Sequence, residues 1–304
     1  MESLIHYNTE SYWLNRVILV VIFLGGMILY RRLFPKQKEY FSQKSPFILR
    51  QDNDKYDSFY LEYYDELNAT ESYCEDDLLF ITETTAPDEK SVFLDIGCGS
   101  GILLGRLEDK NILAFGVDKS AAMEKACQDR LKYTEIYCVD VLADPMLYDN
   151  NTFSHITCTH FTIYEMENKE MLLNYCFNWL KCGGYFIVHL VDPDSYRKVL
   201  PSVHVDEELW PTIMKTNIEN NEYTYRSEFK PKNKGYLFTE TFTDKYTEKV
   251  RQNQINLIME TKQHITDLAT KCGFLVHKES TYKNKIKDPH QYLVIFIKPM
   301  CGKY

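Results

Sequence analysis

The sequence predicts an α/β fold with a seven-stranded sheet, an inserted antiparallel β meander and one apolar helix near the N-terminus. Three observations support this architecture. Short apolar runs alternate with helical stretches between residues 91 and 191, apolar and polar residues alternate with period two between residues 222 and 259, and residues 17–30 form an uncharged apolar run. Strands that alternate with helices form right-handed βαβ units around a mostly parallel sheet.

The composition fits a globular protein and argues against nucleic acid as a partner. Of the 304 residues, 44% are hydrophobic and 26% are charged, which is enough for one large α/β domain with an appendage. The formal net charge is −9. An acidic surface repels phosphate backbones, so no nucleic acid partner is expected.

The cysteines indicate neither a disulfide framework nor a metal site. Their number, nine, is odd, and no two of them have the C-x-x-C spacing of zinc sites. We therefore expect reduced cysteines, a reducing compartment and no bound metal.

Residues 12–34 are predicted to form a transmembrane helix that follows a short tail at residues 1–11. Fourteen helical residues cover only about 21 Å, but the segment from Trp13 to Phe34 is long enough for a bilayer core of about 30 Å. Arg31, Arg32 and nearby lysines follow the segment, whereas no Lys or Arg precedes Arg16. This bias predicts a single-pass membrane protein whose large C-terminal domain lies on the cytoplasmic side. A buried core helix and a signal peptide are the alternatives.

The large domain is expected at residues 56–304, after a polar juxtamembrane linker at residues 35–55. Five strands are predicted at residues 91–96, 113–117, 135–139, 153–159 and 185–191. Helices are predicted at residues 57–67, 121–129 and 169–180, and from residue 102 onwards. The meander at residues 222–259 is followed by a helix that ends at Gly273 and by two last strands at residues 274–277 and 292–298.

The strongest motif is DIGCGSG at residues 95–101, between a predicted buried strand and a helix. Glycines let the backbone turn sharply and let a ligand approach closely. Asp118 and Asp140 end the next two strands, so three carboxylates meet at the carboxyl edge of the sheet. There Asp118 is placed to bind a ribose, and Asp140 an adenine amine. A nicotinamide dinucleotide site is disfavoured because Ile102 replaces the last glycine of that fingerprint.

This spacing resembles that of class I S-adenosylmethionine-dependent methyltransferases, which have a Rossmann-like fold with an antiparallel last strand. The resemblance implies S-adenosylmethionine as the methyl donor. The implied donor-binding residues are Asp95, Gly97, Cys98, Gly99, Gly101, Asp118, Lys119, Asp140, Val141 and His160. The segment LKCGG at residues 180–184 is similar to the family's LKPGG, with Cys182 in place of the proline. The stretch FTIY at residues 161–164 also resembles membrane-anchored methyltransferase-domain proteins of large DNA viruses.

The candidates for acid–base work follow strands four and five. They are His160, Tyr164, His189 and Asp192, but methyl transfer needs a base only when the acceptor must lose a proton. His189 lies in an apolar strand, where a structural role is common. Tyr60, Tyr63 and Tyr64 are candidates for a lid helix over the donor or for core packing.

The methyl acceptor is constrained by two absent motifs. THFT at residues 159–162 replaces the N/D-P-P-Y/F motif of DNA amino-methylases, and the Pro-Cys nucleophile of cytosine methylases is missing. We therefore expect a membrane-anchored methyltransferase that acts on N or O of a small molecule, a lipid or a protein. A catalytically inactive donor-binding or structural membrane or virion protein is the alternative.

Overall fold

The computed structural model describes residues 16–23, 25, 41, 43–196, 198, 214–282 and 286–301. The chain divides into two units, residues 1–44 and 45–304, which are described separately. In the first unit residues 16–23 are helical, with exposed apolar side chains such as Val17 and Phe23. Most of the predicted transmembrane helix at residues 12–34 lies outside the described residues. Within the described part of the chain, no helix is long and apolar enough to cross a membrane.

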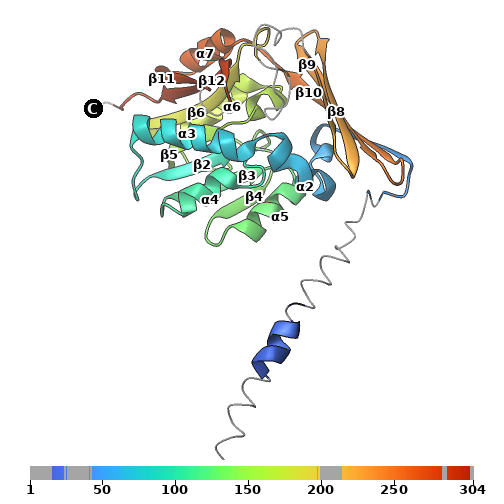
Figure 1. Ribbon diagram of the computed structural model, residues 1–304. Coiled ribbons are helices and arrows are strands. Elements are labelled where there is room, and N and C mark those ends of the chain that lie inside the picture. Colours follow the sequence, from blue (N-terminus) through green and yellow to red (C-terminus); the bar gives the residue numbers. More distant parts are fainter. Residues whose placement is uncertain are drawn as a thin grey trace, which may run out of the picture. The chain divides into compact units, whose positions relative to one another are not determined.

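The second unit contains the predicted seven-stranded mixed sheet (Figure 1). Its order is β11-β12-β6-β5-β2-β3-β4. The strands are β2 (Val92–Ile96), β3 (Leu113–Asp118), β4 (Glu135–Cys138), β5 (Phe153–Cys158), β6 (Leu180–Val191), β11 (Leu275–Tyr282) and β12 (Asp288–Ile297). Strands β2 to β6 run parallel, whereas β12 is antiparallel to both β6 and β11. The expected Rossmann-like sheet with an antiparallel last strand is therefore confirmed. The segment 180–184 opens β6.

Helices cover both faces of this sheet. They are α2 (Ser58–Leu67), α3 (Thr70–Thr85), α4 (Ile102–Glu108), α5 (Ala121–Arg130), α6 (Lys169–Trp179) and α7 (Lys262–Lys271). One buried cluster joins α6 and α7 to the sheet, and a second joins α3 and α4 to its other face. No element was predicted at residues 68–90, which contain the whole of α3.

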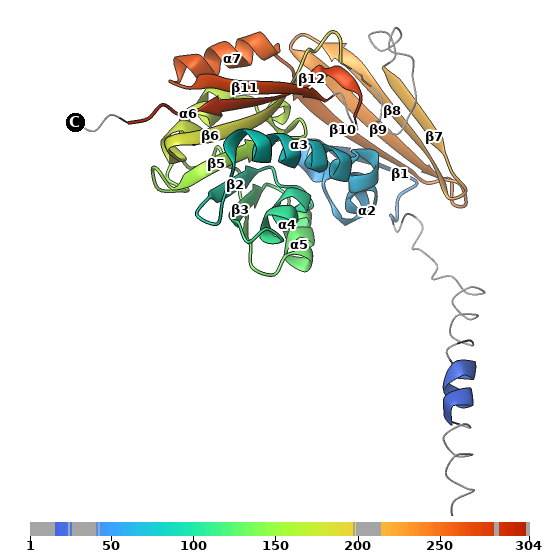
Figure 2. The same ribbon diagram turned by 60° about the vertical axis from the view of Figure 1, so that its left-hand side comes forward.

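The inserted β meander is part of a five-stranded sheet with the order β1-β10-β9-β8-β7 (Figure 2). Its strands are β1 (Phe47–Gln51), β7 (Lys215–Glu219), β8 (Tyr223–Lys232), β9 (Gly235–Asp244) and β10 (Val250–Ile258). Strand β1 pairs in parallel with β10, and the 3-10 helix η1 (Asp52–Lys55) follows it. The predicted linker at residues 35–55 is therefore wrong for residues 47–55. Hydrogen bonds to another strand, rather than hydrophobicity, order this polar segment.

An ion pair between Asp57 and Arg251 binds the beginning of α2 to the inserted sheet. Its carboxylate accepts hydrogen bonds from Nη1 and Nη2 of Arg251, each at 2.9 Å, and from the backbone N–H of Tyr60. The guanidinium of Arg251 also lies over the ring of Phe59, 4.6 Å from its centroid. A bidentate ion pair of this kind orients both partners.

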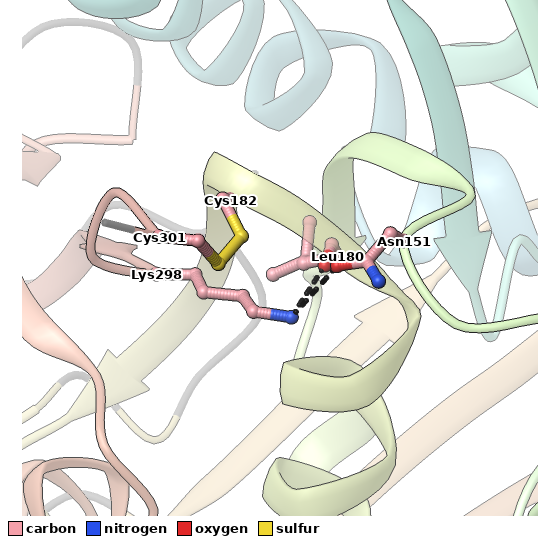
Figure 3. The surroundings of a disulfide bond; sticks show 5 residues. All are labelled: Asn151, Leu180, Cys182, Lys298 and Cys301. Carbon is pink, nitrogen blue, oxygen red and sulfur yellow. Dashed lines mark hydrogen bonds between the residues drawn. A yellow bond between two sulfur atoms is a disulfide. The ribbon is translucent and has the colours of Figure 1, made fainter. Parts of the chain in front are cut away.

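A disulfide joins Cys182 near the beginning of β6 to Cys301 beyond the end of β12 (Figure 3). Beside it the ammonium of Lys298 donates to the carbonyl oxygen of Leu180 at 2.7 Å and to Oδ1 of Asn151 at 3.2 Å. The expectation that every cysteine is reduced is therefore wrong for this pair. Cysteine spacing gave no signal because 119 residues separate the two cysteines and only the pairing of β6 with β12 brings them together.

A buried carboxylic acid joins α3 to the edge of the sheet. Asp77 is 1% exposed, and its Oδ1 accepts a hydrogen bond from the hydroxyl of Tyr282 on β11. Burial raises the pKa of Asp77 to about 8, although this hydrogen bond opposes the change. The side chain is therefore protonated at neutral pH in the folded protein.

We predict that Asp77 makes the protein less stable as the pH rises. Its pKa is higher in the folded than in the unfolded state, so its stabilising contribution is complete below the unfolded pKa near 4 and is lost as the pH passes 8. Asp77→Asn, which stays neutral, should therefore gain at least about 1 kcal/mol relative to wild type between pH 5.5 and pH 9. Urea unfolding at both pH values tests this, with Glu83→Gln on the exposed face of α3 as the control. A parallel pH dependence in wild type and Asp77→Asn would contradict it.

Candidate active site

The glycine loop, residues 97–101, connects β2 to α4 at the carboxyl edge of the sheet. The backbone N–H groups of Gly97 and Cys98 donate to the carbonyl oxygen of Val117 at 2.8 and 3.1 Å. Gly97 has a φ of 69°, and a Cβ there would overlap the side chain of Thr162. Glycine is therefore required at this position for both the turn and the close approach of the next loop.

Asp118 and Asp140 follow β3 and β4 as predicted. The carboxylate of Asp118 accepts hydrogen bonds from the backbone N–H of Gly99 at 3.0 Å and from that of Ser120 at 2.9 Å. Burial raises the pKa of Asp118, and these backbone hydrogen bonds oppose the change. Asp140 lies 4.0 Å from the ammonium of Lys119. Two carboxylates therefore stand beside the glycine loop with fixed orientations.

These groups line a cavity that we call the donor cleft. Its lining consists of Asn53, Tyr56, Tyr64, Ile96, Gly97, Gly99, Val117, Asp118, Lys119, Met123, Val139, Asp140, Val141, His160, Thr162, Glu165 and Met166. Seven predicted donor-binding residues are therefore found together. The other three do not line this cleft: Asp95 and Cys98 line a small adjoining cavity, and Gly101 packs against Cys127.

Asp95 lies beneath the loop and is 4% exposed. Thr157 donates to its Oδ1 at 2.6 Å, and burial raises the pKa of Asp95 to about 7. A carboxyl group at this depth supports the shape of the loop. Because it lines only the adjoining cavity, its predicted contact with the donor stays a prediction.

The segment from η1 to α2 closes one side of the donor cleft. Ser120 donates to the carbonyl oxygen of Tyr56 at 2.6 Å, and Asn53 donates to that of Lys119 at 3.4 Å. From the next turns of α2, Asp65 accepts hydrogen bonds from Ser100 of the glycine loop and from Arg130 of α5. These contacts hold the segment against the loops that carry the carboxylates.

The three lid candidates have different roles. Tyr64 lines the donor cleft, 3.4 Å from the position that a Cβ of Gly99 would take. Tyr60 is buried and donates to Glu240 at 2.8 Å, whereas Tyr63 packs against Phe242. Only Tyr64 therefore covers the cleft as a lid residue would, and the other two join α2 to the inserted sheet.

A second cavity, which we call the acceptor cavity, adjoins the donor cleft and encloses about 920 Å³ including its open mouth. Its lining consists of Lys55, Tyr56, Tyr64, Leu67, Asn68, Tyr73, His160, Phe161, Glu165, Tyr196, Ser227, Phe229, Phe238, Ile255, Leu257, Ile286 and Gln291. Strands β8, β9 and β10 supply one wall, with inward-facing side chains such as Phe229, Phe238 and Ile255. The wall of this cavity is therefore mostly apolar, as is usual for sites that bind small organic molecules.

Four side chains line both cavities, and we call them the transfer boundary: Tyr56, Tyr64, His160 and Glu165. They come from the segment that opens α2 and from the loop after β5. Any group that passes from the donor cleft to the acceptor cavity must pass these four side chains. A group that moves from a molecule in one cavity to a molecule in the other would cross this shared wall.

His160 has an unusual backbone conformation, and one nitrogen of its ring has no hydrogen-bond partner in the described part of the chain. Its φ is 52° and that of Phe161 is 68°, which is a left-handed conformation for two successive residues that are not glycine. Such strain is common at functional sites. The Nε2 atom of His160 is buried and has no hydrogen-bond partner among the described residues. Burial lowers the pKa of His160 to about 4, so the imidazole is neutral at physiological pH.

Glu165 is the acidic member of the transfer boundary. It lies in the 3-10 helix η2 (Thr162–Glu165), and the hydroxyl of Tyr56 donates to its Oε1. Burial raises the pKa of Glu165, while the nearby ammonium of Lys55 opposes the change. Lys55 itself is 4% exposed and forms an ion pair with Glu240 at 3.4 Å.

Two predicted catalytic residues lie elsewhere. Tyr164 is fully buried, and its hydroxyl accepts a hydrogen bond from the backbone N–H of Val191 at 2.8 Å. His189 is fully buried between the rings of Phe161 and Tyr282. Neither residue lines the donor cleft or the acceptor cavity. Both side chains make structural contacts here, and their predicted catalytic role stays a prediction.

Sequence reasoning missed Tyr56, Glu165 and Lys55. Glu165 could have been predicted, because it lies in the same loop after β5 as the candidate His160. No local signal marks Tyr56 and Lys55, because their position depends on the pairing of β1 with β10. Among the described residues, no group of His, Cys, Asp and Glu could hold a metal ion.

Comparisons with known proteins agree with this site. Residues 93–184 match a family model described as a methyltransferase domain. A protein of Alkaliphilus oremlandii named as an uncharacterized methyltransferase is 24% identical over 169 residues, which are 55% of this chain and 77% of the relative.

Two solved structures have the same fold. One is an S-adenosylmethionine-dependent methyltransferase from Clostridium acetobutylicum, with a TM-score of 0.60, 17% identity and coverage of 79% of this chain and 98% of the other. The second is CalS10 from Micromonospora echinaspora, an amino pentose methyltransferase solved with S-adenosylmethionine bound, with a TM-score of 0.57, 13% identity and coverage of 79% and 96%.

Residues 93–184 therefore form a methyltransferase domain, and the second unit has the fold of S-adenosylmethionine-dependent methyltransferases. In CalS10 this fold holds S-adenosylmethionine. The resemblance to methyltransferase-domain proteins of large DNA viruses receives no support from these relatives, which are bacterial.

We predict that Asp118→Ala weakens the binding of S-adenosylmethionine and S-adenosylhomocysteine about 30-fold. Removal of a charge-assisted hydrogen bond to the ribose costs about 2 kcal/mol. Calorimetric titration of the full chain measures this change, with the exposed Asp144→Ala as the control. An unchanged affinity for both ligands would show that Asp118 does not contact the donor.

Proposed function

We propose that the protein transfers a methyl group from S-adenosylmethionine to an N or O atom of a small molecule or lipid in the acceptor cavity. The observation that carries this proposal is the shared wall of four side chains between the donor cleft and the acceptor cavity. A reaction that moves one carbon between two bound molecules needs two adjoining sites with the reacting atoms aligned across their boundary.

The donor cleft fits the donor in three respects. Asp118 offers carboxylate oxygens to a ribose, and Asp140 stands beyond the next strand, where Val139 and Val141 give apolar walls to an adenine. Gly97 and Gly99 line the part of the cleft where the methionine part would lie. The bound donor supplies a sulfonium whose methyl group is electrophilic, and the protein aligns and desolvates the acceptor atom.

The acceptor cavity favours a small molecule or lipid over a protein side chain. Its wall on the inserted sheet is built from Phe229, Phe238, Ile255 and Leu257, so it matches an apolar body rather than an extended polypeptide. The solved structure of CalS10 is named as an amino pentose methyltransferase, which supports a small-molecule acceptor in a related fold.

We also propose that residues 12–34 hold the protein on a membrane with the catalytic domain on the cytoplasmic side. The described part of this segment, residues 16–23, is helical, and Leu19, Ile22 and Phe23 are each more than 60% exposed. Large apolar side chains of a helix are stable in contact with lipid. An anchor of this kind would bring a lipid-soluble acceptor to the cavity.

We predict that Phe229→Trp lowers kcat/KM for methyl transfer by at least about tenfold, because the larger ring fills the acceptor cavity. The affinity for S-adenosylhomocysteine should stay unchanged. Conversion of S-adenosylmethionine is measured by mass spectrometry over a panel of apolar amines and alcohols. Phe47→Trp, on the exposed strand β1, is the control. Unchanged transfer would place the acceptor elsewhere, and donor binding without turnover on the whole panel would favour an inactive donor-binding protein.

We predict that deletion of residues 1–34 moves the protein from the membrane fraction to the soluble fraction. The full chain should sediment with membranes and require detergent for release, because burial of the apolar helix in lipid is favourable. Sedimentation and calorimetry are measured on both forms, and the shortened protein should retain its affinity for S-adenosylhomocysteine. A soluble full chain, or an aggregated deletion product, would contradict the anchor.

A further inference from the structure

We propose that the methyl acceptor is a hydrophobic amine whose ammonium group is received by Glu165 and Nε2 of His160. This inference rests on the proposed function and names the substrate class of the same site. Both side chains line both cavities, so a nitrogen held by them lies at the boundary that the methyl group crosses.

The charges of the cavity wall favour a cation. Glu165 is the acidic and Lys55 the basic side chain among the described residues of the wall, apart from the neutral His160. Lys55 is already paired with Glu240 at 3.4 Å. Glu240 in turn accepts hydrogen bonds from the hydroxyls of Tyr60 and Tyr225 at 2.8 and 2.9 Å. Glu165 accepts a hydrogen bond from Tyr56 and is close enough to Lys55 to feel its charge, but no ion pair within the described part of the chain includes it. A ligand ammonium can therefore pair with this carboxylate, which a hydroxyl cannot do.

The rings around Glu165 also favour a cation. The rings of Tyr56 and Tyr64 lie edge to face, with centroids 6.1 Å apart, and both belong to the transfer boundary. The ammonium of Lys55 already lies 4.8 Å from the centroid of Tyr56 and 5.5 Å from that of Phe238. The aromatic wall therefore accepts a cation in the protein itself, and attraction of a cation to an aromatic face is strong where water is excluded.

His160 supplies the second acceptor of a hydrogen bond. Its buried Nε2 has no partner among the described residues, and buried polar atoms are ordinarily paired. An ammonium has three N–H donors, so it can bond to the carboxylate of Glu165 and to a neutral imidazole at the same time. The strained backbone at His160 and Phe161 is what directs this ring to the boundary.

The rest of the cavity defines the body of the acceptor. Beyond the boundary the wall includes the apolar or aromatic side chains Phe229, Phe238, Ile255 and Leu257, and it also includes the uncharged polar side chains of Asn68, Ser227 and Gln291. These side chains offer no charge to a polar body, so an aryl or alkyl group fits best. A cation at one end and an apolar body at the other give an amphiphilic amine.

The chemistry balances with these residues. The ammonium gives one proton to the carboxylate of Glu165, which leaves a neutral amine with a free electron pair. A nitrogen–carbon bond forms to the methyl group while the carbon–sulfur bond breaks, and its electron pair stays on sulfur as S-adenosylhomocysteine. The product nitrogen carries the positive charge that the sulfonium loses. Glu165 then releases its proton to water.

The test compares an amine with its neutral isostere on the full chain saturated with S-adenosylhomocysteine. Calorimetry measures the binding of 4-phenylbutylamine and 4-phenylbutan-1-ol to wild type, Glu165→Gln, Glu165→Asp and the exposed control Glu167→Gln. Wild type and Glu167→Gln should bind the amine at least tenfold tighter than the alcohol. Glu165→Gln should bind both equally while keeping wild-type affinity for the alcohol, and Glu165→Asp should restore part of the preference.

Three outcomes would overturn the inference. Equal binding of the two probes by wild type would exclude an amine site, and an undiminished preference in Glu165→Gln would exclude Glu165. Loss of S-adenosylhomocysteine binding in a folded Glu165→Gln would make this residue a donor contact instead. Binding of the cosubstrate by wild type without binding of either probe contradicts the acceptor cavity itself, which distinguishes failure of the proposed function from failure of this inference.

Discussion

The site depends on the hydrogen bonds that hold the glycine loop to the end of β3. Gly97 and Cys98 donate to the carbonyl oxygen of Val117, and Gly99 donates to the carboxylate of Asp118. Two neighbouring strands and the loop between β2 and α4 are thereby fixed to one another. The contact of Thr162 with Gly97 then carries the loop after β5 to the same place. The donor cleft and the transfer boundary therefore share one rigid base.

The donor half of the site could be predicted because its residues directly follow strands. Parallel strands bring their carboxyl ends to one edge, so Asp118 and Asp140 meet at the glycine loop whatever the rest of the chain does. The acceptor half could not be predicted in this way. Lys55 and Tyr56 reach the cavity only because β1 adds to β10, some 200 residues later in the chain. No local pattern of hydrophobicity records a pairing of that kind.

The contacts of Glu240 make the inserted sheet a part of the site. Its carboxylate accepts hydrogen bonds from Tyr60 of α2 and Tyr225 of β8 and pairs with Lys55. Separating a buried carboxylate from these partners costs free energy. The segment from η1 to α2 and the inserted sheet are therefore held together. The shape of the acceptor cavity therefore depends on two segments together. One was predicted to be a linker at residues 35–55, and the other is the inserted meander.

The same burial that shapes the transfer boundary also suits it to methyl transfer. Burial there keeps His160 neutral and raises the pKa of Glu165. A carboxylate in such surroundings binds an approaching cation strongly and takes up its proton readily, which is what an amine needs before its electron pair becomes nucleophilic. Positive charge then moves from sulfur to nitrogen without leaving the boundary. The protein has to align the two reacting molecules beside an aromatic wall, and a stronger base is unnecessary.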